Sequence, residues 1–111
     1  MKYALLIGLT YRWSAKEFRR LGTIPSIQRL RDTLVGDLGF KRENVEIMTD
    51  LWKSLDRTSL VSGLIGLAAK TKLEDELVVL LAGHGSPHPV TPSFYVDDSC
   101  TGIMGKLIFL G

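Results

Sequence analysis

An apolar run from Glu76 to Ala82, followed by Gly83-His84-Gly85, constrains the fold of this chain more than any other feature. A continuous apolar run of this length is typical of a parallel strand that is buried on both faces. The two glycines let the backbone turn sharply and leave the imidazole uncrowded. Because open α/β sheets hold their chemistry at the carboxyl ends of strands, His84 is a candidate functional residue. The alternative is a turn whose glycine pair encloses a histidine by coincidence.

Strand and helix patterns alternate before that run. Tyr3–Leu9 and Val45–Thr49 have the composition of strands. A first helix is predicted after the capping residue Ser26 and ends at Gly39, and a second is capped by Asp56 or Thr58. The expected apolar faces are Ile27, Leu30, Leu34 and Leu38 in the first helix and Leu60, Val61, Leu64, Ile65 and Ala68 in the second. The order predicts an α/β fold, with a parallel sheet, right-handed crossovers and flanking helices.

The last quarter of the sequence has weaker patterns. Residues 86–92 hold three prolines and predict a loop, and 94–96 predict a short strand. Residues 97–105 are expected to form turns, and 106–110 are a final apolar run. A sheet that ends in this way has an unpaired apolar edge, which is a liability unless something covers it.

Composition limits the classes of protein to which the chain can belong. Its 111 residues are enough for one domain, 1–111. Fourteen basic residues against twelve acidic ones give a net charge of +2, which is too balanced to indicate nucleic acid as a partner. A single cysteine, Cys100, excludes an internal disulfide and indicates the cytoplasm or the nucleus. No apolar run approaches the thickness of a bilayer, so we expect no membrane partner. A local basic cluster is interpreted as a solvated loop and helix face: Arg12, Lys16, Arg19, Arg20, Arg29 and Arg31.

The sequence gives no support for a cofactor or a metal ion. No phosphate-binding glycine loop follows the first strand. His84 and His88 are four positions apart, but Pro87 between them prevents a shared helical face. Asp97 and Asp98 are more typical of a solvated turn than of a cation site. We therefore expect neither cofactor nor structural metal.

An ordered series of segments carries a resemblance to a known family. The segments are Lys2–Leu9, Leu21-Gly22-Thr23 with the helix after it, Gly39-Phe40 leading to Val45–Asp50, Thr58 at a helix start, and Glu76–Gly85. In this order they resemble the caspase and metacaspase family of cysteine endopeptidases, and most of all fungal metacaspase-type sequences. The resemblance implies a caspase-like three-layer sandwich, with a mostly parallel sheet flanked by helices.

The resemblance also implies roles for individual residues. His84 would be the base of a Cys-His dyad, and the Gly85 N–H would donate to the oxyanion of the tetrahedral intermediate. Cys100 lies in Asp98-Ser99-Cys100-Thr101-Gly102, which superficially resembles the family's nucleophile motif. It follows His84 by only 16 positions (100 − 84), whereas caspase-type signatures separate the two residues by about 50. We therefore expect Cys100 to be an ordinary loop thiol. Residues 94–110 would be the variable segment before the nucleophile strand, so that 1–111 is a caspase-like domain incomplete at its C-terminus.

Substrate preference and alternative functions stay open. Metacaspases cleave after arginine or lysine by means of acidic pocket residues, but Pro25-Ser26 stand where the resemblance places an acidic pair. Asp50 is expected to cap or orient a turn. The implied partner is a peptide or protein substrate. One alternative is a non-catalytic interaction or regulatory module, which would pair its sheet edge with another copy or with a related caspase-like chain. The other is an unrelated small α/β binding domain.

Overall fold

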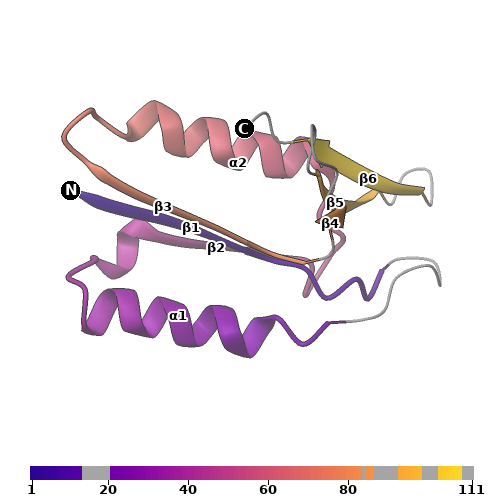
Figure 1. The fold of residues 1–111 in the computed structure, drawn as a ribbon, viewed down its shortest axis with the longest axis horizontal. Helices are drawn as coiled ribbons and strands as arrows, with labels where there is room; N and C mark the ends of the chain where they lie inside the picture. Colours follow the sequence, from indigo (N-terminus) through magenta and orange to yellow (C-terminus); the bar gives the residue numbers. More distant parts are fainter. Residues whose placement is uncertain (14–20, 84, 87–92, 99–102, 109–111) are drawn as a thin grey trace.

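The computed structural model describes residues 1–13, 21–83, 85–86, 93–98 and 103–108, and from residue 85 on it describes the backbone (Figure 1). Along the chain the elements are β1 (Lys2–Gly8), α1 (Ile24–Gly36), a short 3₁₀ helix (Arg42–Asn44), β2 (Val45–Thr49), α2 (Arg57–Lys70), β3 (Glu76–Ala82), β4 (Gly85–Ser86), β5 (Ser93–Asp98) and β6 (Ile103–Ile108).

The first three strands form a parallel sheet in the order β2-β1-β3. Gly8 at the end of β1 is in register with Thr49 on one side and with Ala82 on the other, so the three strands end together. Five successive residues of β1, from Ala4 to Gly8, are buried. The central strand is therefore β1, because it alone of the three has a described neighbour on each side.

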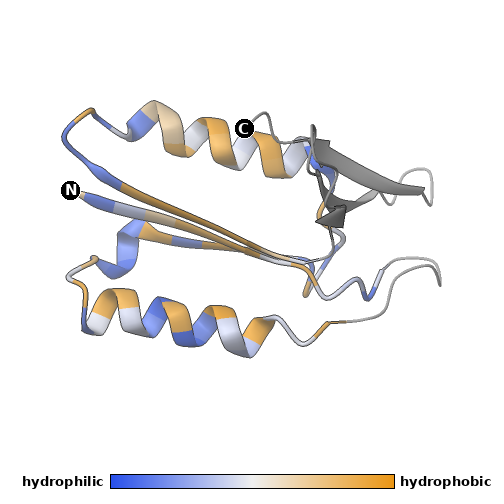
Figure 2. Ribbon diagram, in the orientation of Figure 1, coloured by the Kyte–Doolittle hydropathy of each residue, from blue (hydrophilic) through white to orange (hydrophobic). Residues whose placement is uncertain are grey.

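The two helices cover opposite faces of this sheet, as Figure 1 shows. Leu60 and Leu67 of α2 pack in one cluster with Leu5 and Ile7, whereas Ile27 and Leu34 of α1 pack in the other with Ala4 and Leu6. The chain moves from β1 to β2 through α1, and then back past β1 to β3 through α2. The second crossover runs across the sheet in the opposite direction to the first and lies on the opposite face. The two crossovers therefore have the same hand. The predicted three-layer α/β arrangement is confirmed, and its apolar interior is visible in Figure 2.

The boundaries predicted for α1 are wrong at both ends. The residue before the first helical turn is Thr23, so Ser26 lies inside the helix beside Pro25 instead of capping it. Proline fits there because the first turn has no intrahelical use for its N–H. The helix ends at Gly36, and Leu38 is exposed. Gly39, with φ of +77°, lies in the turn that follows, a conformation that glycine adopts without strain.

The prediction of a cap at Asp56 is confirmed for α2, while its apolar face differs in part. The Ser59 N–H donates to the Asp56 carboxylate at 2.8 Å. Leu60 is buried as expected, but Ile65 and Ala68 are exposed and Leu67 is buried in their place. The helix lies close to β2 at Gly63, where a Cβ atom would be 2.6 Å from the Met48 sulfur. This close approach sets which side of α2 faces the sheet.

The prediction that residues 76–82 form a strand buried on both faces is wrong. Within the described sheet β3 pairs with β1 alone, so it is an edge strand. Leu77 and Val79 are 45% and 42% exposed on the face that α2 covers elsewhere. The fully buried parallel strand is β1, whose apolar run is of similar length.

Strands β4, β5 and β6 form a second, antiparallel sheet in that order. Ser86, predicted in a loop, lies in β4. Asp97, Asp98 and the residues 103–105 were expected in turns, yet they pair across β5 and β6, with Asp98 opposite Ile103. The described part of the last apolar run, residues 106–108, therefore pairs in a hairpin and adds no strand to the described parallel sheet. Backbone pairing overrides the weak turn signals of Asp and Gly here.

Candidate functional site

The carboxyl ends of the parallel strands define the candidate site. The segment after β1 leads to α1 on one face, and the segment after β2 leads to α2 on the opposite face (Figure 1). Open α/β sheets bind ligands outside the carboxyl ends of their strands. At this edge the segments after β1 and β2 lie against each other.

Asp50, the first residue after β2, is fully buried at this edge. Its two carboxylate oxygens accept from the Thr10 N–H at 2.9 and 3.1 Å, and from the Tyr11 N–H at 2.7 Å. The Thr10 hydroxyl donates a further hydrogen bond of 2.9 Å. A buried carboxylate is tolerated because these donors replace its hydration. We expected Asp50 to orient a turn, and the turn that it orients is the one after β1.

Tyr11 shows the conformational consequence of these bonds. Its φ of 62° makes it the one non-glycine residue with left-handed backbone geometry among those described. This geometry is unfavourable for a bulky residue. The hydrogen bond to Asp50 and the burial of the Tyr11 side chain hold it in place. The backbone therefore turns at Tyr11 and directs Arg12 and Trp13 toward the segment after β2.

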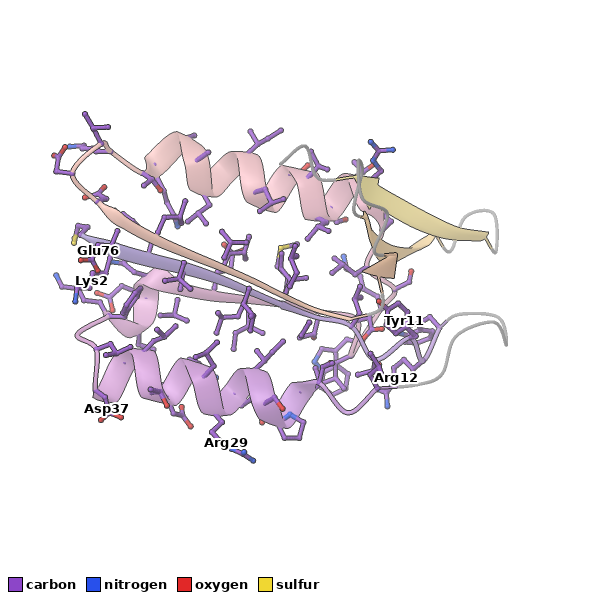
Figure 3. The ribbon with its side chains drawn as sticks, in the orientation of Figure 1. Lys2, Tyr11, Arg12, Arg29, Asp37 and Glu76 are labelled. Carbon is purple, nitrogen blue, oxygen red and sulfur yellow. The ribbon has the colours of Figure 1, made fainter. Side chains whose placement is uncertain are left out.

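Arg12 and Trp13 are both fixed to that segment. A guanidinium N–H of Arg12 donates to the Leu51 carbonyl oxygen at 2.9 Å, and the Trp13 indole N–H donates to the Asp50 carbonyl oxygen at 2.5 Å. Their side chains are otherwise exposed, and Trp52 beside them is 87% exposed. Figure 3 shows Tyr11 and Arg12 together at the carboxyl end of the sheet.

Two adjoining grooves result. The carboxyl-edge groove has a volume of about 340 Å³ and is lined by Arg12, Trp13, Leu51 and Trp52. The β2-edge groove, of about 440 Å³, is lined by Ile47, Met48, Thr49, Trp52, Lys53, Leu55 and Ser59. Trp52 lines both grooves and separates them. Apolar and aromatic walls with a few polar groups are typical of ligand-binding surfaces.

The residues predicted from sequence are placed only in part. His84 and Cys100 lie outside the described residues, as do Lys16, Arg19 and Arg20 of the basic cluster. The two neighbours of His84 are described. Gly83 follows β3 directly, and the Gly85 backbone lies in β4 opposite Phe94. The catalytic roles of His84, Cys100 and Gly85 remain predictions.

Sequence reasoning missed the two grooves. The signal was present, since Trp13 and Trp52 are aromatic residues in the connections that follow two strands. Two other findings are limited to the described part of the chain. No cluster of three potential metal ligands occurs there, and neither helix has the length and apolarity needed to cross a bilayer.

Comparison with known proteins gives one informative similarity. No protein-family model matches the chain. Metacaspase-6 of Arabidopsis thaliana is 33% identical to it over an alignment of 104 residues, and the match covers 91% of this chain and 27% of the plant protein. The similarity supports a caspase/metacaspase-like family. Because this relative is a plant protein, the expected likeness to fungal sequences gains no support. The chain spans about a quarter of the relative's length.

Proposed function

We propose that this chain is part of a caspase/metacaspase-type cysteine endopeptidase domain, in which His84 is the general base for a cysteine nucleophile. The observation that carries the proposal is the similarity to metacaspase-6 along nearly the whole chain. It agrees with the parallel three-strand sheet, whose third strand leads directly into Gly83-His84-Gly85. The partner on this proposal is a peptide or protein substrate, and the location is the cytoplasm or the nucleus.

The chemistry needs three groups at one edge of a sheet. A histidine at the end of β3 would accept the proton of a thiol, and the resulting thiolate would attack the carbonyl carbon of the scissile bond. The negative charge that develops on the carbonyl oxygen would be stabilised by backbone N–H donors, for which Gly85 is the candidate. The imidazole would then return its proton to the leaving amine.

A chimera tests the proposal, because the chain spans a quarter of the plant protein. In metacaspase-6 the matching segment is replaced by this chain, and hydrolysis of a panel of fluorogenic peptides is measured. We expect the chimera to hydrolyse peptides, and His84→Ala to lower kcat/KM by about 10²- to 10⁴-fold. Thermal melting of both chimeras verifies that they fold. A folded chimera whose hydrolysis does not depend on His84 contradicts the proposal.

Cys100 is tested separately, on the chain itself. A thiol-reactive peptidyl probe is applied to the wild type, to His84→Ala and to Cys100→Ala. We expect slow labelling of Cys100 that His84→Ala leaves unchanged, as for an ordinary loop thiol. Labelling that His84→Ala abolishes would instead make the two residues a dyad within this chain.

The edge of β3 supports a second candidate function, which is pairing with another copy of the chain. Leu77 and Val79 are partly exposed there, and β3 has one described neighbour. An exposed apolar edge strand is a template for strand addition. Val79→Lys would then lower the self-association measured by sedimentation. Equal sedimentation of the variant and the wild type, both as monomers, would exclude it.

A further inference from the structure

The carboxyl-edge groove has the composition of a recognition site that the proposed peptidase chemistry does not use. Three of its four lining residues are large and apolar, namely Trp13, Leu51 and Trp52, and the fourth is Arg12. Tryptophan and arginine are the residues that most often dominate binding energy at protein interfaces. The groove also lies at the carboxyl edge of the parallel sheet, the edge where open α/β sheets bind ligands.

Two of the groove's four lining side chains, Arg12 and Trp13, are held in place before any ligand binds. The bonds from Arg12 to the Leu51 oxygen and from Trp13 to the Asp50 oxygen fix one wall to the other. Beneath them, Asp50 holds the backbone of Thr10 and Tyr11. A ligand therefore loses little free energy in ordering Arg12 and Trp13.

The charges at the groove favour an acidic occupant. Arg12 has five N–H donors, of which one bonds to a described residue, so the guanidinium can also bind a carboxylate. Lys53 adds a second cation in the adjoining groove. Two carboxylates of described residues are already engaged, since Asp50 is buried under four hydrogen bonds and Asp56 caps α2. The first turn of α1 contains no acidic residue.

We propose that the carboxyl-edge groove binds a peptide segment in which an acidic residue is flanked by apolar residues, with the carboxylate on Arg12 and the apolar side chains on Trp13 and Trp52. The inference rests on the proposed function for the choice of a peptide as ligand. It adds to that function a site that selects acidic and apolar sequence.

Intrinsic fluorescence tests this directly, because the two tryptophans of the chain both line the groove. The probe is the blocked pentapeptide Ala-Leu-Glu-Leu-Ala, and the matched controls replace its glutamate by glutamine or lysine. We expect a saturable change in tryptophan emission with the glutamate peptide and at least about tenfold weaker binding of the lysine peptide. Binding should also weaken as salt is raised.

Variants assign the effect to the groove. Arg12→Gln should weaken binding of the glutamate peptide about tenfold or more, whereas Arg29→Gln should leave it unchanged. Arg29 is a matched control because it is exposed on α1 and points away from the sheet (Figure 3). Trp52→Ala, measured by calorimetry, should weaken the glutamate and glutamine peptides alike. Thermal melting shows whether each variant is folded. If Arg12→Gln does not fold, binding is measured with Arg12→Lys instead, because lysine keeps the positive charge.

The outcome is independent of the peptidase proposal. The variant His84→Ala should bind the glutamate peptide as the wild type does, so a failure of catalysis does not affect this result. Equal binding of the lysine and glutamate peptides would overturn the inference. Unchanged binding by folded Arg12→Gln, or equal weakening by Arg29→Gln, would overturn it as well.

Discussion

At the scale of single residues, Asp50 has the largest described role in shaping the candidate site. The carboxylate joins the end of β2 to the turn after β1 through Thr10 and Tyr11. Those bonds cross 39 to 40 positions of sequence, so they also fix which two segments lie together at the edge of the sheet. The strained φ of Tyr11 persists because this carboxylate compensates for it.

Replacing Asp50 should therefore cost stability. Asp50→Ala leaves the backbone N–H groups of Thr10 and Tyr11 without their acceptor, and we expect the free energy of unfolding to fall by about 3 kcal/mol. Thr10→Val removes only the hydroxyl donor and should cost about 1 kcal/mol. Urea unfolding followed by circular dichroism measures both. A cost for Asp50→Ala no greater than that for Thr10→Val would show that water replaces the carboxylate.

Asp56 gives the chain a predictable response to acid. The Ser59 N–H bound to its carboxylate is the main reason that the pKa of Asp56 lies below its ordinary value. A carboxyl group whose pKa is lower in the folded state stabilises the fold above its unfolded pKa, which is about 3.9. That contribution is lost as the pH falls through the folded pKa. Stability should thus decrease below about pH 4.

Two substitutions separate the charge of Asp56 from its role as a helix cap. At pH 7, Asp56→Ala should lower the free energy of unfolding by about 1 kcal/mol, because the cap is lost. Asparagine caps as well as aspartate, so Asp56→Asn should cost less at pH 7 and reduce the loss of stability below pH 4. Asp75, whose pKa the Lys72 N–H lowers, supplies acid sensitivity that remains in both variants. Urea titrations at pH 7 and pH 3 measure the difference.

At the scale of elements, two glycines of α2 have opposite surroundings. A Cβ atom at Gly66 would meet nothing within 4 Å, but at Gly63 it would be 2.6 Å from the Met48 sulfur. Helix propensity favours alanine over glycine by about 1 kcal/mol at both positions. At Gly63, unlike Gly66, the close approach of Met48 in β2 opposes this gain in stability.

We therefore expect Gly66→Ala to raise the free energy of unfolding by about 1 kcal/mol. Gly63→Ala should be less stable than Gly66→Ala by about 1–3 kcal/mol, because Met48 must move or the helix must shift from the sheet. Chemical unfolding under identical conditions gives the comparison. Equal gains at the two positions would mean that α2 does not pack on β2 as closely as described.

The elements that sequence predicted well are those whose signal is local. The runs at residues 3–9 and 45–49 and the cap at Asp56 need no knowledge of distant contacts, and the structure has them close to the predicted positions. The order within the sheet is not local. The apolar runs of β1 and β3 are of equal length, so only strand pairing reveals that β1 is central and β3 is an edge.

At the scale of the whole molecule, the candidate site was likewise predictable only where its sequence signal is local. Sequence pointed to the carboxyl end of a strand and to His84, because a histidine between glycines is a local pattern. It could not show that Arg12 and Trp13 meet Leu51 and Trp52, since these segments are nearly forty positions apart and join only after the sheet forms. The carboxyl-edge groove is therefore formed by tertiary packing, and no local sequence motif predicts it.

The central claim is that His84 is the base of a cysteine peptidase, and kcat/KM of the metacaspase-6 chimera tests it most directly. The chimera with His84 and its His84→Ala counterpart are measured on the same peptide, with thermal melting as the check on folding. We predict a loss of about 10²- to 10⁴-fold with little change in melting temperature. Equal kcat/KM for the two folded chimeras would contradict the account.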